Sequence, residues 1–196
     1  INYGNQCDYL TSTATKSRGL REYIVKQGGP DHPNANIDFK LGDVVTTVIK
    51  TINGETITLQ HDTNLPRPYS LGFKVQGTRG IWMDINDSIF IEGKTPSHNW
   101  ESDQKYMKEY DHSLWKKYEH LAEGAGHGGM DWFIINDFVE SVKNNTPPPL
   151  DVYDCATMSV ITPLTENSIK EGGKPQKFPD FTKGKWKNRK SIFARI

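Results

Sequence analysis

Alternating apolar and polar residues predict two strands in the first third of the chain. Residues 44–52 and 55–63 are rich in β-branched side chains, and Asn53-Gly54 lies between them. Asn-Gly between two such runs favours the tight turn of a β-hairpin, because both residues accept the positive φ angles that the turn requires. Residues 8–15, rich in Tyr and Thr, form a third predicted strand.

Shorter strands are predicted further along the chain. Residues 71–76 and 80–84 form a second predicted hairpin across 77–79, and residues 88–92 add one more strand. Successive hairpins build an antiparallel sheet, and such a sheet can leave one face open. The strand pattern therefore predicts a largely antiparallel, open-faced sheet.

Helical spacing of apolar residues replaces the strand pattern after Pro96. Pro163 lies inside the last of these segments, and we expect it to kink or break that helix. Residues 174–196 show no periodicity and are expected to lie over the surface. The predicted helices cover residues 19–26, 100–110, 113–122, a segment from the glycine-rich stretch 124–132 to about 144, and 152–170.

Length and charge restrict the classes of function. The 196 residues fit a single domain, and 24 Lys and Arg balance 24 Asp and Glu. A chain without net charge has no field that recruits nucleic acid or an anionic membrane, so neither is an expected partner. No apolar run is long enough to span a membrane. Cys7 and Cys155 are far apart in sequence, and two buried free thiols are expected rather than a disulfide.

The glycine-rich stretch 124–132 contains the first candidate site. His127 and Asp131 are four residues apart and share one face if the helix has begun there. They suit a general base with an orienting carboxylate, or half of a metal site. Alternatively, Asp131 caps the helix and His127 only forms a hydrogen bond. A metal site needs three or four converging ligands, and the other cluster, His61 and Asp62, points to opposite faces of a strand, so no metal is expected.

The same stretch matches the dinucleotide fingerprint G-x-G-x-x-G at Gly124, Gly126 and Gly129. The fingerprint has a physical basis only where the glycines follow a buried strand. Here residues 113–122, a charged segment with helical spacing, come before them. We therefore expect no cofactor-binding residues in this chain.

Arg67 and Tyr69 form the second candidate site. Pro66 and Pro68 stiffen the segment that carries them. Tyr69 could donate a hydrogen bond to a polar ligand or transfer a proton, and the alternative is that it covers a sheet edge. Arg67 could bind a carboxylate, or lie in solvent. No closely spaced carboxylate pair of the kind that ordinary glycoside hydrolysis uses is apparent in the sequence.

Eight short motifs in a fixed order carry a resemblance that covers residues 8–186. Together they closely resemble the C-terminal half of glycoside hydrolase family 109, the NAD-dependent α-N-acetylgalactosaminidases within the glucose–fructose oxidoreductase and inositol dehydrogenase superfamily. The motifs are Asp8-Tyr9-Leu10, Gly42-Asp43-Val44-Val45-Thr46-Thr47, Leu59-Gln60-His61-Asp62-Thr63, Pro66-Arg67-Pro68-Tyr69-Ser70, Gln76-Gly77-Thr78-Arg79-Gly80, Gly126-His127-Gly128-Gly129-Met130-Asp131, Asp151-Val152-Tyr153-Asp154 and Lys177-Phe178-Pro179-Asp180-Phe181.

This resemblance implies an α+β (α/β) fold, an open-faced and mostly antiparallel sheet with helices packed on one face. It also implies that residues 1–196 form a single C-terminal substrate and oligomerisation domain, and that an N-terminal Rossmann domain, absent from this chain, holds NAD in a longer parent protein. In the family, NAD oxidises the sugar at C3, the glycosidic bond is lost by elimination, water adds, and the hydride returns. A ketone stabilises charge at the neighbouring carbon, which would make a carboxylate pair unnecessary.

Site roles follow from the same resemblance. The tyrosine of Pro-Arg-Pro-Tyr binds substrate in the family, so Tyr69, with Arg67 beside it, is the predicted sugar-binding residue. His127 and Asp131 match a family motif and are predicted as catalytic from the glycine-rich stretch. A Tyr-Pro-Thr-His stretch that contacts sugar in the family is absent and would lie before Ile1. The polypeptide is therefore not expected to catalyse the reaction alone.

Two alternatives stay open, namely a sugar dehydrogenase of the same superfamily and a non-catalytic carbohydrate-binding or assembly module. A homo-oligomer is expected to form through the open sheet face, because an exposed sheet needs a cover. The chain starts at Ile1 rather than Met, so the compartment is unknown, with export or the periplasm of a bacterium as one option.

Overall fold

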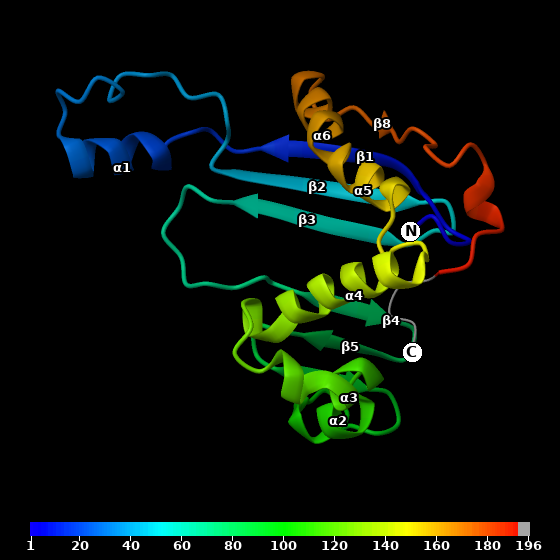
Figure 1. The fold of residues 1–196 in the computed structure, drawn as a ribbon. Helices are drawn as coiled ribbons and strands as arrows, with labels where there is room; N and C mark the ends of the chain where they lie inside the picture. The colour runs from blue at the N-terminus through cyan, green and yellow to red at the C-terminus, as the bar shows by residue number, and fades with distance from the viewer. Residues whose placement is uncertain (192–196) are drawn as a thin grey trace. The chain divides into compact units, whose positions relative to one another are not determined.

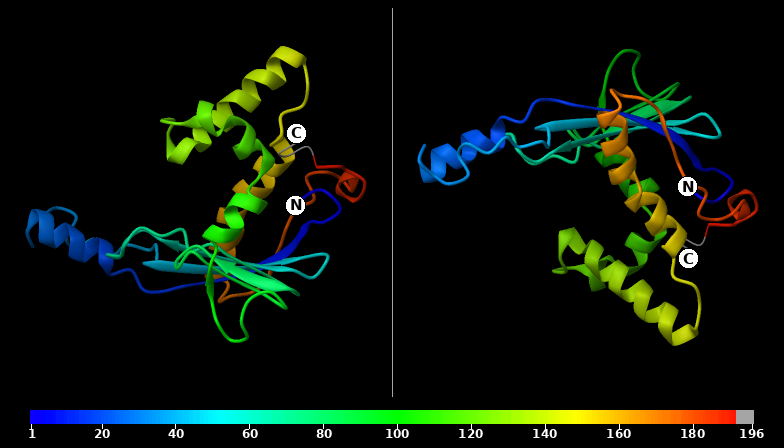
Figure 2. Two further views of the ribbon diagram at one scale, coloured as in Figure 1. Left: turned by 90° about the horizontal axis from the view of Figure 1, so that it is seen from below. Right: turned by 90° about the horizontal axis from the view of Figure 1, so that it is seen from above.

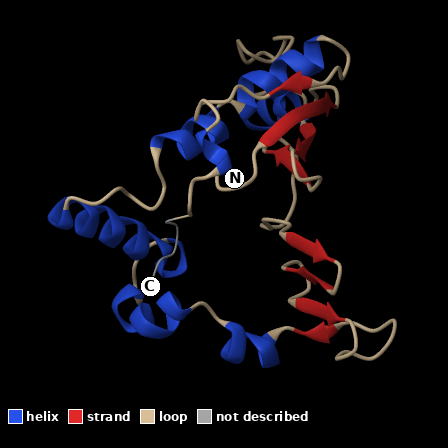
Figure 3. Ribbon diagram, turned by 90° about the vertical axis from the view of Figure 1, so that its right-hand side faces the viewer, coloured by secondary structure: helices blue, strands red, loops and turns tan. Residues whose placement is uncertain are grey.

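The computed structural model describes residues 1–191, which divide into two compact units. Among these residues, the first unit comprises 1–66 and 145–191, and the second comprises 67–144. Each unit contains its own four-stranded sheet, and every strand pairing in both sheets is antiparallel (Figures 1 and 3). The predicted class, open antiparallel β-structure mixed with helices, is confirmed.

The sheet of the first unit has the order β3-β2-β1-β8. It consists of β1 (Cys7–Ala14), β2 (Val44–Thr51), β3 (Thr56–Asp62) and β8 (Gln176–Lys177). The hairpin predicted at Asn53-Gly54 is confirmed, because β2 pairs with β3 in a continuous register from Val44↔Asp62 to Lys50↔Thr56. Gly54 has φ of 107°, a conformation that glycine adopts without strain.

One face of this sheet packs against the helix α6 (Ile161–Lys170), which follows α5 (Val152–Ser159) in the chain and lies on one side of the sheet in Figure 2. Burial alternates along β2, and Leu10 and Ile49, which are paired across the strands, are fully buried. Ile161 and Leu164 of α6 pack against them. This alternation is the period of two that a half-buried strand requires.

Hydroxyl groups extend the contact between the helix and the sheet. The hydroxyls of Ser12, Thr47 and Thr165 form a triangle of hydrogen bonds, with oxygen separations of 2.8 to 3.3 Å. Ser168 Oγ accepts a hydrogen bond from Ser12 N at 2.9 Å and donates one to Lys174 O at 2.8 Å. These polar side chains are buried with their partners, so α6 is fixed over β1 at a specific position.

The predicted helix over residues 152–170 is two helices that meet at Val160. The break lies three residues before Pro163, which occupies the first turn of α6. A proline in the first turn removes an N–H that has no partner within the helix, so it is tolerated there. Asp151 caps the start of α5, because its carboxylate accepts hydrogen bonds from Tyr153 N and Asp154 N.

The expectation that the tail lies loosely over the surface is wrong for the described residues up to 191. Gln176 and Lys177 pair with β1, Phe178 packs against the core, and Thr182 is 1% exposed. A short 3₁₀-helix, η2 (Lys185–Lys187), follows. The strand β8 has only two residues, too few to produce a detectable alternation.

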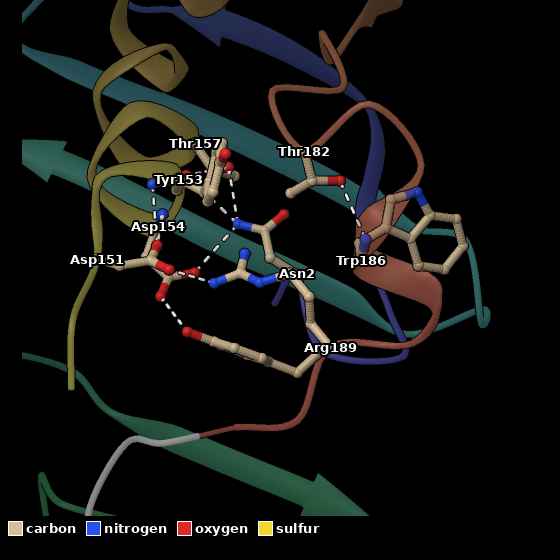
Figure 4. Close-up of polar contacts among 9 residues, drawn as sticks. Asn2, Asp151, Tyr153, Asp154, Thr157, Thr182, Trp186 and Arg189 are labelled. Carbon is tan, nitrogen blue, oxygen red and sulfur yellow. Dashed lines mark hydrogen bonds and ion pairs between the residues drawn. The ribbon is translucent and has the colours of Figure 1, made fainter. Parts of the chain in front are cut away.

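A polar network joins both ends of the first unit to α5 (Figure 4). Asn2 Nδ2 donates hydrogen bonds to Asp154 Oδ1 and to Thr157 Oγ1, each at 3.1 Å. The Tyr3 hydroxyl donates to Asp154 Oδ2 at 2.7 Å. The Arg189 guanidinium pairs with Asp151 and lies 4.7 Å from the centroid of the Tyr3 ring. The chain near Asn2 and the chain near Arg189 are therefore held by the same helix.

In the second unit the sheet has the order β4-β5-β6-β7. Its helices α3 (Ser113–Ala122) and α4 (Met130–Asn144) pack through aromatic rings, with the Trp115 and Phe133 ring centroids 4.7 Å apart. Residues 101–102 form a strand, so the helix predicted from residue 100 begins only at Gln104. The elements are β4 (Lys74–Gly77), β5 (Gly80–Met83), β6 (Ser88–Ile91), β7 (Glu101–Ser102), α2 (Gln104–Tyr110), α3 (Ser113–Ala122), η1 (His127–Gly129) and α4 (Met130–Asn144).

Three remaining features complete the fold. The predicted helix near residue 19 is α1 (Gly19–Gly28); Gly19 N at its start and Arg18 N just before it donate to the buried Asp43 carboxylate. Both cysteines are free as expected, but Cys155 is exposed whereas Cys7 is buried. Across residues 1–191 the structure contains no helix with the length and apolar character that crossing a membrane requires.

Replacing Leu10 by Ala should lower the free energy of unfolding by about 2–5 kcal/mol, because it leaves a cavity between β1 and α6. The matched change Val48→Ala, on the opposite face of the same sheet, should cost about 1 kcal/mol or less. Urea denaturation followed by circular dichroism measures both. Equal losses for the two variants would contradict the assignment of the buried face.

The Tyr3 hydroxyl gives a prediction in alkaline solution. Burial and the Asp154 carboxylate raise the pKa of Tyr3 from 10.0 to about 12. Between pH 10 and about 12 the folded state keeps a proton that the unfolded state has lost. The free energy of unfolding should therefore fall as pH rises through this window, and below it should not vary with pH on account of Tyr3. Tyr3→Phe should remove this part of the pH dependence in denaturation curves, whereas Tyr23→Phe, at an exposed site, should not.

Candidate functional site

The turn between α3 and α4 has an unusual backbone. Gly124, Gly128 and Gly129 all have positive φ, and His127 has φ of 53°, which few residues other than glycine adopt. A Cβ atom on Gly126 would lie 2.3 Å from Asp131 Oδ2. Glycine at position 126 is thus what allows the Asp131 carboxylate to fold back over the turn.

This turn brings the predicted pair together. His127 Nδ1 lies 2.9 Å from Asp131 Oδ1 and 3.0 Å from Asp131 Oδ2. A carboxylate only accepts hydrogen bonds, so Nδ1 carries the hydrogen and a neutral ring presents Nε2 as an acceptor. The His127 side chain is 76% exposed, so the ring is accessible to a ligand. The pair has the arrangement of a base with an orienting carboxylate.

A cavity of about 410 Å³ lies beside α4, and of this pair Asp131 lines it whereas His127 does not. Its polar groups include a carboxylate, an amide and an ion pair between Lys143 and Glu140 at 2.9 Å. Trp132 adds an aromatic wall, and its ring centroid lies 5.5 Å from that of Tyr118. The lining residues are Ala125, Asp131, Trp132, Ile135, Asn136, Val139, Glu140 and Lys143.

Sequence reasoning identified Asp131 but missed the other polar residues of this cavity. Asn136 and Glu140 follow Trp132 at intervals of four, which places them on one side of the helix. This spacing of polar residues along one side of the helix could have identified the polar wall of the cavity from the sequence. Trp132 contacts Tyr118 and Phe133 and also lines the cavity.

Arg67 and Tyr69 lie on the connection between β3 and β4. The guanidinium Nη1 of Arg67 donates to Pro68 O at 3.2 Å and to Ser70 O at 3.1 Å, so Arg67 braces the backbone around Tyr69. Tyr69 is 88% exposed. Neither residue lines the cavity beside α4. Their action on the same ligand as His127 and Asp131 stays a prediction.

A larger cavity, of about 620 Å³, lies in the first unit between β2, β3 and α6. Val45, Leu59, Ile161 and Ile169 are among the apolar residues that line it. It is lined by no Phe, Tyr or Trp ring, and two of its hydroxyls, those of Thr47 and Thr165, are hydrogen-bonded to each other. It is therefore less suited to a polyhydroxyl ligand than the cavity beside α4.

The residues present do not form a dinucleotide site. Gly124, Gly126 and Gly129 lie between α3 and α4, and no strand leads into them. The backbone N–H groups of Gly129 and Asp131 donate to Gly126 O, and Gly129 N also donates to Ala125 O. These donors are therefore not available to cradle a phosphate. Among residues 1–191 no group of three or more His, Cys, Asp or Glu side chains converges as metal ligands would.

Comparison with known proteins decides the family. Residues 1–188 match the model of the glycosyl hydrolase 109 C-terminal domain. The chain belongs to glycosyl hydrolase family 109. A glycosyl hydrolase family 109 protein of Stenotrophomonas maltophilia is 57% identical over 195 residues, which are 99% of this chain and 43% of that protein.

Two further family 109 relatives carry a more specific name. An α-N-acetylgalactosaminidase of Tannerella forsythia is 50% identical over 99% of this chain and 42% of its own length. An α-N-acetylgalactosaminidase of Shewanella oneidensis is 38% identical over 98% of this chain and 43% of its own length. The chain thus spans less than half the length of the curated relatives that it matches.

The His127–Asp131 hydrogen bond in this family 109 chain can be tested by substitution. Asp131→Asn should abolish the preference for hydrogen on Nδ1, because an amide can donate as well as accept. Nitrogen-15 NMR of the imidazole at neutral pH measures the tautomer. Asp137→Asn, on the same helix, should leave the His127 spectrum unchanged. Unchanged His127 signals in Asp131→Asn would mean that the pair does not form in solution.

Proposed function

We propose that this chain forms the sugar-facing part of an α-N-acetylgalactosaminidase. The observation that carries the proposal is the family match over residues 1–188, together with relatives named α-N-acetylgalactosaminidase that align over nearly the whole chain. The physical support is the accessible His127–Asp131 pair, which lies beside a cavity with polar and aromatic walls.

The roles of the four predicted residues follow from their contacts. The Asp131 carboxylate holds the His127 ring with Nδ1 protonated, so Nε2 can accept a hydrogen bond or a proton from a sugar hydroxyl or an adjacent carbon. Tyr69 presents its hydroxyl as a donor or acceptor for the sugar. Arg67 holds the carbonyl groups around Tyr69 and thereby orients it.

Trp132 and the polar groups of the cavity fit the general chemistry of a sugar. A pyranose has an apolar face of C–H groups and a rim of hydroxyls. The flat ring of Trp132 suits the first, and Asn136, Glu140 and Lys143 supply donors and acceptors for the second. The N-acetyl group adds an amide that both donates and accepts.

Oxidation and reduction of the sugar, as the family resemblance implies, require NAD. The described residues do not fit a dinucleotide, so in this proposal NAD is held outside them. Bound there, NAD would supply reversible hydride acceptance. The contribution of this chain is to bind the sugar, orient it and move a proton at His127 Nε2.

The test uses a polypeptide that joins this chain to the region that its relatives carry outside the match. It is given a chromogenic α-N-acetylgalactosaminide and a catalytic amount of NAD. Release of the chromophore without net NADH is expected. NADH formed in stoichiometric amounts would instead indicate a sugar dehydrogenase, and sugar binding without turnover would indicate a binding module.

Two substitutions in that polypeptide test the residues. His127→Asn should lower kcat by about 100-fold or more if the imidazole transfers a proton. Tyr69→Phe should lower kcat/KM by about 3- to 10-fold, the value of one hydrogen bond. Tyr23→Phe, an exposed tyrosine on α1, is the matched control and should have no effect. Full activity in both site variants would exclude these residues from the site.

A further inference from the structure

Gly129 packs tightly against α3 at the end of the turn that carries His127. It is buried and has φ of 98°. A Cβ atom at this position would lie 3.1 Å from Ala122 O, 3.2 Å from Ala122 Cβ and 3.2 Å from Trp115 Cη2. Carbon atoms in ordinary contact are about 3.5–4.0 Å apart, so the backbone of Gly129 lies too close to α3 to leave room for a side chain.

Trp115 and Ala122 present one face of α3 to Gly129. They are seven residues apart, which is about two helical turns, so their side chains lie on the same side of the helix. Ala122 is 1% exposed, and its small methyl group lets the turn approach the helix closely. The Trp115 ring also packs against Phe133 of α4, with the centroids 4.7 Å apart. One side chain of α3 therefore reaches both the turn and α4.

The position of Gly129 determines the rest of the turn through backbone hydrogen bonds. Gly129 N donates to Ala125 O at 3.2 Å and to Gly126 O at 3.1 Å, and Asp131 N donates to Gly126 O at 3.3 Å. Gly126 is the residue whose missing side chain leaves room for the Asp131 carboxylate. A displacement of Gly129 would therefore also move Gly126 relative to Asp131.

The His127 ring is oriented by the backbone and by Asp131 rather than by packing. Its side chain is 76% exposed, and the Asp131 carboxylate holds it by a hydrogen bond. His127 and Gly128 have φ of 53° and 67°, a conformation that a residue with a side chain keeps only where its surroundings impose it. The contact between Gly129 and α3 is the nearest packed point from which this conformation can be imposed.

We infer that Trp115 is a positioning residue for the His127–Asp131 pair and that it acts through Gly129. The indole ring holds Gly129 at its place on α3, and the turn then keeps the imidazole within reach of the carboxylate. Trp115 is not among the residues that line the cavity beside α4, so its role is to position and not to bind. This role rests on the proposed function, in which the pair accepts a proton from the sugar.

The two contacts of Trp115 can be separated by substitution. Trp115→Phe keeps an aromatic ring that can pack against Phe133, but a phenyl ring ends closer to its own backbone and lacks the Cη2 atom that reaches Gly129. Gly129→Ala disturbs the same contact from the other side, because its Cβ atom would displace the turn from α3. Both variants should therefore release the turn while the packing of α3 on α4 is kept.

Nitrogen-15 NMR of the His127 imidazole in this chain, at neutral pH and without substrate, tests the positioning role. Trp115→Phe and Gly129→Ala should each shift the His127 signals from the Nδ1-protonated form toward a mixture of the two tautomers, because the tautomer is set by the hydrogen bond to Asp131. Circular dichroism checks that the helices are kept. Trp100→Phe, at an exposed tryptophan of the same unit, is the matched control and should leave the signals unchanged.

Three results would overturn this role. The first is unchanged His127 signals in both variants. The second is the absence, in the unsubstituted chain, of a nuclear Overhauser effect between the Trp115 ring hydrogen on Cη2 and the Gly129 Hα hydrogens, a measurement that does not depend on any variant folding. The third is a further change of the His127 signals when Trp115→Phe is added to Asp131→Asn, since a residue that acts through the pair has no further effect once the pair is lost.

Kinetics separate this role from the proposed function. In the polypeptide that joins this chain to the region outside the match, Trp115→Phe should lower kcat by about 10- to 100-fold, because misplacing a reacting group by about 1 Å has an effect of this order. KM should stay within about threefold, since Trp115 does not line the cavity. Trp100→Phe should leave both unchanged. Shifted His127 signals with an unchanged kcat would support the positioning role of Trp115 and contradict the proton transfer proposed for His127.

Discussion

The packing of α6 on one face of β1 and β2 is the constraint on which the first unit depends. Leu10 and Ile49 are buried at its centre, and Ile161 and Leu164 close it from the helix side. A shift of β1 by one residue would place Tyr9 and Thr11 where Leu10 and Ser12 lie. It would break both the apolar contact and the hydroxyl triangle. Two independent interactions therefore determine the register of β1 against β2.

The small apolar core makes hydrogen bonding unusually important in this chain. More polar than apolar residues are buried among residues 1–191, and nearly all of the buried polar residues that tie elements together have partners at normal distances. Leaving a buried polar group without a partner lowers the free energy of unfolding by more than its hydrogen bond contributes. The elements that carry these groups must therefore keep the positions at which the hydrogen bonds form. Asp154 illustrates this, because it fixes Asn2 and Tyr3 on α5 at once.

The candidate site is governed by the backbone rather than by burial. Gly126 leaves the space into which Asp131 folds, and the positive φ of His127 turns its ring toward that carboxylate. Strain of this kind persists only where surrounding contacts over-determine it. Here the surrounding contacts are the aromatic packing of Trp115, Trp132 and Phe133, which joins α3 to α4. Function in this proposal thus depends on a turn that a helix pair holds in place.

Local chemistry made several features predictable from the sequence. Asn53-Gly54 determined the hairpin, and the helical pattern predicted the bounds of α3 and the approximate C-terminal end of α4. The spacing of His127 and Asp131 drew attention to the pair, but the helix begins only at Met130, so the turn with positive φ at His127, and not a shared helical face, brings them into contact. The eight motifs identified the family, which the comparisons confirm.

Tertiary structure alone decided the features that depend on distant residues. β8 exists because β1 offers an edge, and β7 exists because β6 does. The break at Val160 separates α5, which holds Asn2 and Tyr3, from α6, which covers the sheet. The division of the strands into two sheets, and the choice of side chains that line each cavity, follow from packing between segments far apart in the chain. A local pattern records only the period of an element, whereas its neighbours determine where it starts, stops and faces.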